Sequence, residues 1–290
     1  MKHRLTVAGI TLGLAFTASL ATPSAHAVRP VEHKTAAPVV VAKVSANAIH
    51  LSTTSLRAGK ITFKVVDTKA HGVAVLQILR IHQGYSPGAL QTDIGRAFGG
   101  PGVTLDQQLA SIANLDDEVT WLSGAQATPK KNGWFDIKLG KGSYFLIDQD
   151  GNGVTQLAVH GTTVKRTAPS AHGASIITYT YGFDTTGTLP HDGWVRTTNK
   201  ADQPHFIIAQ RVKQGTTHRQ VARFIKSGAQ SNPTWALRAN SGLGVISPGK
   251  TGMWKIDLPK GEYLLQCFWP DRMDGAPHFF HGMWQLVQLH

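Results

Sequence analysis

Short runs in which apolar and polar residues alternate recur along this chain. Examples are KITFKVV (residues 60–66), GWFDIKL (133–139), SYFLID (143–148) and TQLAVHG (155–161). Alternation with a period of two is typical of strands that place one face against a core. Glycine-containing stretches such as LGKGSY and LPKGEY separate these runs and are typical of turns. We therefore predict a protein built mainly of antiparallel strands.

Two segments have the apolar spacing of helices instead. They are TLDQQLASIANL (residues 104–115) and TTHRQVARFIKSG (216–228), with Thr104 and Thr217 as N-cap residues. The apolar residues of the second segment share one helical face: Val221, Phe224 and Ile225. We expect each segment to be a short helical insertion between strands.

The sequence repeats itself once. TPKKNGWFDIKLGKGSYFLID (residues 128–148) aligns without a gap to SPGKTGMWKIDLPKGEYLLQC (247–267). Such an alignment predicts a duplicated domain of about 120 residues, within the usual domain size. The expected divisions are a lead-in (28–46), a first domain (47–166), a linker (167–174) and a second domain (175–290). Many strands with one helical insertion per half indicate an all-β fold of two tandem β-sandwich domains.

The first residues have the pattern of a secretory signal peptide. A basic start, MKHR, precedes a short apolar run, and AHA ends at Ala27. We therefore exclude residues 1–27 from the fold and expect a secreted protein. No later apolar run reaches the roughly 18 residues of a membrane helix, so we expect no membrane insertion.

Charge and cysteine content reduce the number of possible functions. The net charge is +12, but the basic residues are scattered singly, which indicates a basic soluble surface and no nucleic-acid partner. The single cysteine, Cys267, excludes an intramolecular disulfide. Exported proteins usually pair their thiols or lack them, so this lone thiol requires an explanation.

Four residues of the second half form a combination with metal-binding chemistry. His205 begins an apolar run, Cys267 ends another, and His278 and Met283 follow in PHFFHGM. A thiolate and two imidazoles with a weak axial thioether suit copper better than other common metals. The alternative is that Cys267 is a buried, inert strand cysteine.

On the motifs QPH, PKGEYLLQC and PHFFHGM, the second half resembles the cupredoxin superfamily, in particular exported bacterial cupredoxin-like proteins. The resemblance implies Greek-key β-sandwiches and one copper ion in the C-terminal half. It also implies the copper ligands, which would be His205, Cys267, His278 and Met283. The stretch between the cysteine and the second histidine is long for this family.

Because the stretch between Cys267 and His278 is long, the distances between the donor atoms decide whether a metal site can form. If a site forms, the sulfur and the two histidine nitrogens should be roughly 3–4 Å apart, since metal–ligand bonds are about 2.0–2.3 Å. We expect Phe268 and Trp269 to pack over the site and exclude water. Residues 271–275 should form a solvated turn that extends outward without moving His278.

The first half lacks these residues. The positions aligned with the four candidate ligands are all changed: Ala74, Asp148, Leu157 and Thr162. The first domain should therefore have no metal site and a structural or interactive role.

These patterns predict an exported copper protein that passes single electrons to or from a redox partner protein, as a monomer. Duplicated cupredoxin domains also occur in laccases and copper nitrite reductases, whose second copper requires further histidines. Gln266 and Phe268 flank Cys267, and no His-x-His pair is present, so we expect no enzymatic activity. The alternative is a metal-free cupredoxin-like module for binding or structure at the cell surface.

Overall fold

The computed structural model describes residues 35–290 except 71, 150–152 and 230–231, and leaves the side chain of residue 239 undescribed. The predicted signal peptide, residues 1–27, and part of the lead-in lie outside the described residues. The described part of the chain forms one compact unit. None of its helices is long and apolar enough to cross a membrane.

The first half begins with short strands and contains a helical hairpin between two strands of one sheet. Its strands are β1 (Thr35–Ala36), β2 (Val39–Val44), β3 (Ile49–Leu51), β4 (Ser55–Asp67), β5 (Ala74–Ile81), β6 (Val119–Ala127), β7 (Gly133–Leu139), β8 (Gly142–Asp148), β9 (Val154–Val164) and β10 (Arg166–Thr167). Its helices, α1 (Pro87–Ala97) and α2 (Leu105–Glu118), lie between β5 and β6.

The second half repeats this plan with a single helix. Its strands are β11 (Ser175–Tyr179), β12 (Gly182–Thr186), β13 (Asp192–Asn199), β14 (His205–Val212), β15 (Ala236–Ile246), β16 (Thr251–Asp257), β17 (Gly261–Gln266) and β18 (Trp284–Leu289). Its helix, α3 (His218–Lys226), lies between β14 and β15.

Strand order is the same in the two halves. One sheet has the order β3-β2-β4-β7 in the first half and β12-β11-β13-β16 in the second. In both sheets the second and third strands run parallel: β2 with β4, and β11 with β13. The other has the order β9-β8-β5-β6 and β18-β17-β14-β15. The predicted fold class, all-β sandwiches with a helical insertion in each half, is confirmed.

Strand register also agrees with the alignment of the repeats. The pair β5 and β8 has the same register as the pair β14 and β17. Ala74 and His205, the first residues of β5 and β14, therefore occupy equivalent positions, as the sequence predicted. Asp148, aligned with Cys267, ends β8 and forms a buried ion pair with Lys69.

The two halves share their sheets. Strand β7 pairs with β16, and β6 meets β15 where Ala125 lies opposite Leu243. At this meeting point Gly124 and Gly244 are in close approach, because a Cβ on Gly244 would lie 2.6 Å from the Gly124 Cα. Strand β2, inside the predicted lead-in, pairs with β4 and supplies core residues, so the packed body begins earlier than expected.

The helices confirm two predictions and correct one omission. Thr104 and Thr217 are N-caps with full capping boxes, as their sequences predicted. Helix α1 was not predicted, because Pro87 and several glycines resemble a turn. In the structure Ser86 caps α1 and Pro87 occupies its first turn, where proline is favourable. The first half therefore carries a two-helix insertion.

Candidate metal centre

Strand pairing brings His205 and Cys267 to the same end of one sheet. His205 is the first residue of β14, and Cys267 directly follows β17. These strands are antiparallel neighbours, with Ile208 opposite Gln266, so the start of one lies beside the end of the other. Two residues 62 positions apart in the sequence therefore become neighbours.

The long loop after Cys267 folds back on itself and returns His278 to the same place. Pro270 pairs with Pro277 in an isolated bridge, and the Asp271 N–H donates to the Ala276 carbonyl at 2.8 Å. The His278 N–H donates to the Trp269 carbonyl, also at 2.8 Å. The extra length is thus contained in a small hairpin outside the site.

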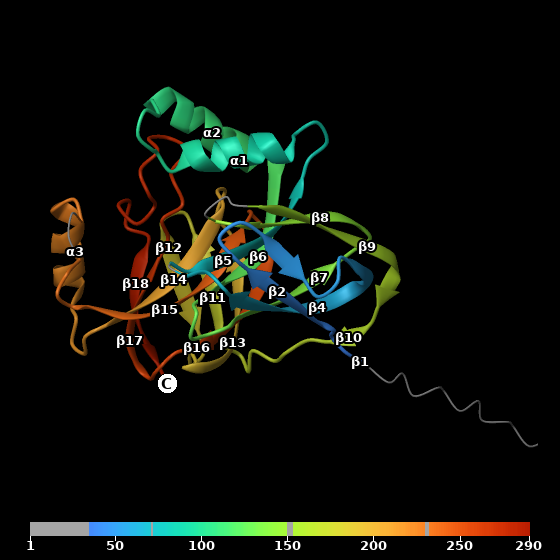
Figure 1. Cartoon of the computed structure of the whole chain (residues 1–290). Coiled ribbons are helices and arrows are strands. Elements are labelled where there is room, and N and C mark those ends of the chain that lie inside the picture. The colour runs from blue at the N-terminus through green and yellow to red at the C-terminus, as the bar shows by residue number, and fades with distance from the viewer. Residues whose placement is uncertain (1–34, 71, 150–152, 230–231) are drawn as a thin grey trace, which may run out of the picture. The chain divides into compact units, whose positions relative to one another are not determined.

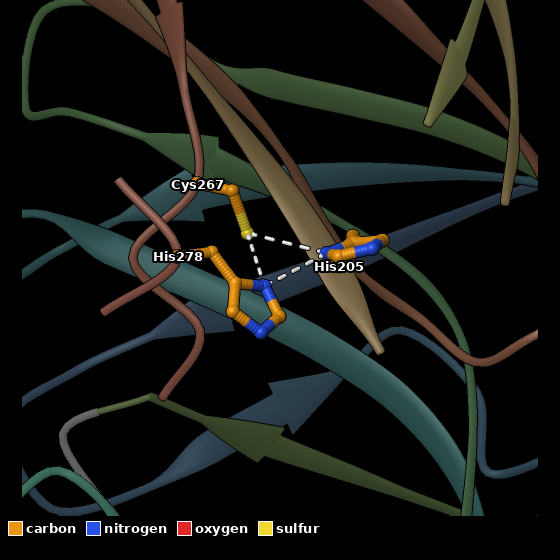
Figure 2. A group of neighbouring side chains, drawn as sticks. All are labelled: His205, Cys267 and His278. Atoms are coloured by element: carbon orange, nitrogen blue, oxygen red, sulfur yellow. Dashed lines mark hydrogen bonds between the residues drawn. The ribbon is translucent and has the colours of Figure 1, made fainter. Parts of the chain in front are cut away.

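Three donor atoms converge at this end of the sheet (Figure 2). The Cys267 Sγ lies 3.7 Å from the His205 Nδ1 and 3.9 Å from the His278 Nδ1. The two Nδ1 atoms are 3.0 Å apart. All three side chains are buried. The sulfur–nitrogen separations fall in the range that we expected for a metal site.

The triangle of donor atoms has the size that a metal ion requires. The point in its plane equidistant from the three atoms lies about 2.1 Å from each of them. Metal–nitrogen and metal–sulfur bonds in proteins are about 2.0–2.3 Å. The residues present therefore fit a three-coordinate metal without a change of backbone.

Burial keeps both histidines neutral. It lowers the pKa of His205 to about 3, with a further contribution from His278. Burial also lowers the pKa of His278 to about 4, although the negative charge of Asp271 opposes the shift. Two neutral imidazoles with Nδ1 atoms facing one point can each offer a lone pair to a metal ion.

The cysteine is held as a thiol in the metal-free protein. Burial raises the pKa of Cys267 to about 12, while backbone N–H groups of Trp269 and Phe206 lower it. A thiolate is the form that binds a metal, so binding must release this proton. The same two N–H groups would then stabilise the thiolate.

Met283, the fourth predicted ligand, is fully buried in the hydrophobic cluster that contains Cys267. Its carbonyl accepts the Cys267 N–H at 3.3 Å, and its own N–H donates to the His278 carbonyl at 3.0 Å. These contacts place its backbone beside the other three residues. A bond from its thioether to a metal stays a prediction.

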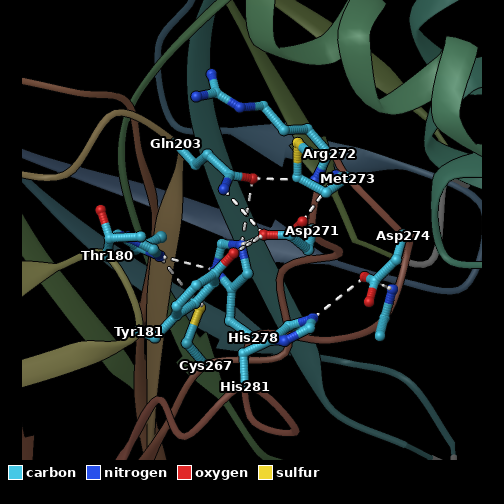
Figure 3. Close-up of polar contacts among 12 residues, drawn as sticks. Thr180, Tyr181, Gln203, Cys267, Asp271, Arg272, Met273, Asp274, His278 and His281 are labelled. Atoms are coloured by element: carbon cyan, nitrogen blue, oxygen red, sulfur yellow. Dashed lines mark hydrogen bonds and ion pairs between the residues drawn. The ribbon is translucent and has the colours of Figure 1, made fainter.

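A network of polar side chains lies behind His278 (Figure 3). The Asp271 carboxylate is 3.6 Å from the His278 Nε2 and accepts hydrogen bonds from the Tyr181 hydroxyl and the Gln203 amide. Burial disfavours the ionised carboxylate, but these hydrogen bonds outweigh it, and the pKa of Asp271 lies below its usual range. A negative charge beside the outer nitrogen orients an imidazole that binds a metal.

This network corrects one expectation. We expected residues 271–275 to form a solvated turn; residues 272–274 are exposed, as expected, but Asp271 and Gly275 at its two ends are buried. Tyr181 and Gln203 were not predicted either, because they come from segments far from Asp271 in the sequence. Asp271 itself lies between proline and arginine in a polar stretch, which gives no signal of burial.

Helices of the first half cover the outer side of this loop. The Gln108 amide donates to the Gly275 carbonyl at 2.9 Å and to the Ala97 carbonyl at 3.0 Å. Trp269 is buried and meets the rings of Phe98 and Trp121 edge-on. Trp269 thus lies in the same buried cluster as Cys267 and Met283 and also packs against the other half.

No protein-family model and no curated protein matches the chain. Among solved structures, auracyanin A, a "blue" copper protein from Chloroflexus aurantiacus, is 12% identical and covers 42% of this chain and 99% of its own, with a TM-score of 0.30. The copper nitrite reductase from Nitrosomonas europaea is 11% identical and covers 89% of this chain and 94% of its own, with a TM-score of 0.23. A multi-copper oxidase from Pediococcus acidilactici is 8% identical and covers 88% of this chain and 59% of its own, with a TM-score of 0.25.

All three structures are named as copper proteins. Their TM-scores are low, so the argument for a metal rests on the donor atoms above and not on these alignments.

The same comparison corrects the prediction that the chain is not an enzyme. Structures that cover most of this chain include multi-copper oxidases and copper nitrite reductases, which are enzymes. The sequence argument considered only histidines adjacent to Cys267 and His-x-His pairs. Ligands can also come from separate strands, as the candidate donors His205 and Cys267 do here.

Proposed function

We propose that this chain is an exported copper protein that holds one copper ion between His205, Cys267 and His278. The observation that carries the proposal is the convergence of one sulfur and two nitrogen atoms on a buried point about 2.1 Å from each. Bound copper would supply a one-electron couple between Cu(II) and Cu(I), and we propose single-electron transfer as its use.

The types of donor favour copper over zinc. Zinc sites use cysteine, histidine and carboxylate ligands in tetrahedral sets, with four ligands in structural sites. Here a thiolate and two imidazoles form a triangle, and the remaining candidate, Met283, offers a thioether. This combination is typical of copper sites that transfer electrons.

The protein's own groups prepare the site for that role. Burial removes water and keeps both imidazoles neutral, so no proton competes for their nitrogens near neutral pH. Asp271 holds the ring of His278 from behind. Strands β14 and β17 fix His205 and Cys267, so the donors need little movement when the metal changes its charge.

Export is the second part of the proposal, and it is supported by the basic, apolar and small-residue pattern of residues 1–27. An oxidising compartment would also make a lone thiol hazardous unless a metal occupies it.

Colour and metal content test the proposal. Purified protein that receives Cu(II) should bind one copper ion, measured by native mass spectrometry, and should absorb strongly in the visible from a copper–thiolate bond. Cys267→Ser should abolish the absorption, because a hydroxyl cannot replace the thiolate. Protein that stays colourless and metal-free would contradict the proposal.

Two methionine variants form a matched pair. Met283→Leu should retain copper but shift the absorption if the thioether is the axial ligand. Met273→Leu alters an exposed methionine of the same loop and should leave the spectrum unchanged. Identical spectra for both variants would remove Met283 from the ligand set.

A further inference from the structure

The loop that follows Cys267 and carries His278 is called the ligand loop below. A groove of about 350 Å³ lies between helix α3 and the end of this loop. Figure 1 shows α3 beside β18, on the edge of the second half. One wall carries the cations of α3, Arg219, Arg223 and Lys226, and the other carries Phe280 and Trp284. Phe280 is 38% exposed, so an aromatic surface is open to solvent next to three positive charges.

The three cations form one stripe. Arg223 follows Arg219 by four residues and Lys226 follows by three more, so all lie on one face of the helix. All are exposed, and among the described residues none forms an ion pair. Glu262 has other partners, since it accepts the N–H groups of Gly215 and Thr216 just before α3.

The stripe is unfavourable for the helix itself. Like charges four residues apart destabilise a helix. Arg223 and Lys226 lie in the last turn, where cations complement the helix dipole, but Arg219 lies in the first turn, where a positive charge is disfavoured. Helix stability therefore does not explain Arg219. An anion bound in the groove would explain all three cations.

The aromatic wall is continuous with the candidate metal site. Phe280 lies two residues after His278 and meets the Phe279 ring edge-on, with centroids 5.7 Å apart. Phe279 is buried and packs on Phe268, at 4.9 Å, which directly follows Cys267. A molecule in the groove would therefore be separated from the donor atoms by a short chain of aromatic residues.

We propose that this groove docks a carboxylate-rich surface of a single-electron redox protein. The proposal rests on the electron-transfer function given above. Carboxylates of the partner would pair with Arg219, Arg223 and Lys226, and its redox centre would face Phe280. One electron leaves the reduced centre of the partner and converts Cu(II) to Cu(I), while no bond forms and no proton moves. The net positive charge of the chain would speed the encounter at low ionic strength.

Binding of an acidic probe tests the docking surface without any metal. The probe is a fluorescent oligoglutamate peptide, measured by anisotropy with the copper-free protein at low and high salt. The variant R219Q/R223Q/K226Q should weaken binding about tenfold or more, because the charges act together. A matched variant, K43Q/K138Q/K141Q, removes the same charge from exposed positions of the first half and should weaken it by less than about twofold.

Three outcomes would overturn the docking surface. The first is the absence of peptide binding by the natural sequence. The second is equal weakening in the two triple variants, since net charge alone would then act. The third is tighter binding of a single-stranded oligodeoxynucleotide through the same three cations, which would identify a nucleic-acid site. Circular dichroism should show that R219Q/R223Q/K226Q retains its fold, because removal of Arg219 relieves an unfavourable charge.

A second measurement tests the electron route and separates this proposal from the proposed function. Ferricyanide, a small trianion, takes one electron from the Cu(I) protein in stopped-flow experiments. At low salt the oxidation rate of R219Q/R223Q/K226Q should be lower than that of the unchanged protein. At high salt the two rates should become equal, because salt screens the charges. An unchanged rate would overturn the route through the groove. Protein that binds the peptide but no copper would instead contradict the proposed function, and with it the delivery of electrons.

Discussion

Cys267 carries a proton that a metal must displace. Its pKa is raised to about 12, whereas those of His205 and His278 are lowered to about 3 and 4. Between pH 5 and 8 the imidazoles are already deprotonated, so metal binding releases only the thiol proton. The affinity for Cu(I) should rise about tenfold per pH unit in this range.

Competition with a chelator of known Cu(I) affinity, repeated across this pH range, measures the slope. A steeper rise would show that the imidazoles are protonated in the metal-free protein. A flat profile would show that the thiol is not a ligand.

Asp271 acts on the metal through His278. Asp271→Asn removes the negative charge beside the imidazole and weakens its orientation. Because changes behind a metal ligand typically cost about 10- to 100-fold in metal affinity, we expect a loss of that size. Asp274→Asn alters an exposed carboxylate of the same loop, which accepts hydrogen bonds from His281 and from the Ala276 N–H, and serves as the control. Equal affinities of the two variants would show that Asp271 has no such role.

The candidate donor residues could be predicted from the sequence, but the polar residues that surround His278 could not. His205, Cys267 and His278 could be singled out because few side chains offer soft or imidazole donors, and each stood at a strand end or in a late loop. Asp271, Tyr181 and Gln203 could not, since ordinary polar residues gain a role only when the fold buries them together.

At the scale of elements, the helices of the first half contact the ligand loop of the second half and hold it in place. Gln108 in α2 donates to the Gly275 carbonyl in that loop and to the Ala97 carbonyl in α1. Gln108→Ala removes both hydrogen bonds. The free energy of unfolding should fall by about 1–3 kcal/mol, because each of the two bonds contributes roughly 0.5–1.5 kcal/mol.

Urea unfolding measures this loss, and hydrogen exchange at residues 271–276 should accelerate with it. The control is Gln156→Ala, which alters an exposed glutamine of β9 and should change stability by less than about 0.5 kcal/mol. Unchanged exchange in the loop would show that α2 does not hold it.

Helix α1 is the helix that local sequence patterns did not predict. Helices α2 and α3 were predicted because threonine caps precede regular apolar spacing. In α1 the buried Leu90 and Ile94 have helical spacing, but Pro87 and Gly88 before them are typical of a turn. Packing against the second half, through Phe98 and Trp269, favours the helix and cannot be read from a local window.

At the scale of the whole molecule, the two halves have the same strand order but different chemistry at one position. Where the second half has Cys267, the first has Asp148, which is paired with Lys69 and accepts the Val75 N–H. A buried ion pair thus stands at the position that carries a candidate ligand in the other half.

Breaking this pair should affect stability and not copper. Lys69→Met leaves the Asp148 carboxylate buried without its main counter-charge, so the free energy of unfolding should fall by about 3–5 kcal/mol. The double variant Lys69→Met/Asp148→Leu removes both charges and should recover much of the loss. Copper stoichiometry, measured by mass spectrometry, should stay at one in all three proteins. Loss of copper in a folded variant would contradict a metal-free first half.

Duplication could be predicted from the sequence because turns and strand ends kept their spacing. The shared sheets could not, since they depend on glycines such as Gly124 and Gly244 that allow close approach between the halves. The prediction of no enzymatic activity failed for a related reason. It searched for histidines beside Cys267 and for His-x-His pairs, whereas the candidate donors of this fold come from distant strands.

The central claim is that one sulfur and two nitrogens of this chain bind a single copper ion. X-ray absorption at the copper edge measures those ligands directly. The account predicts one sulfur and two imidazole nitrogens around copper in the natural protein, and the loss of the sulfur in Cys267→Ser. A copper environment of nitrogen and oxygen alone in the natural protein would contradict it.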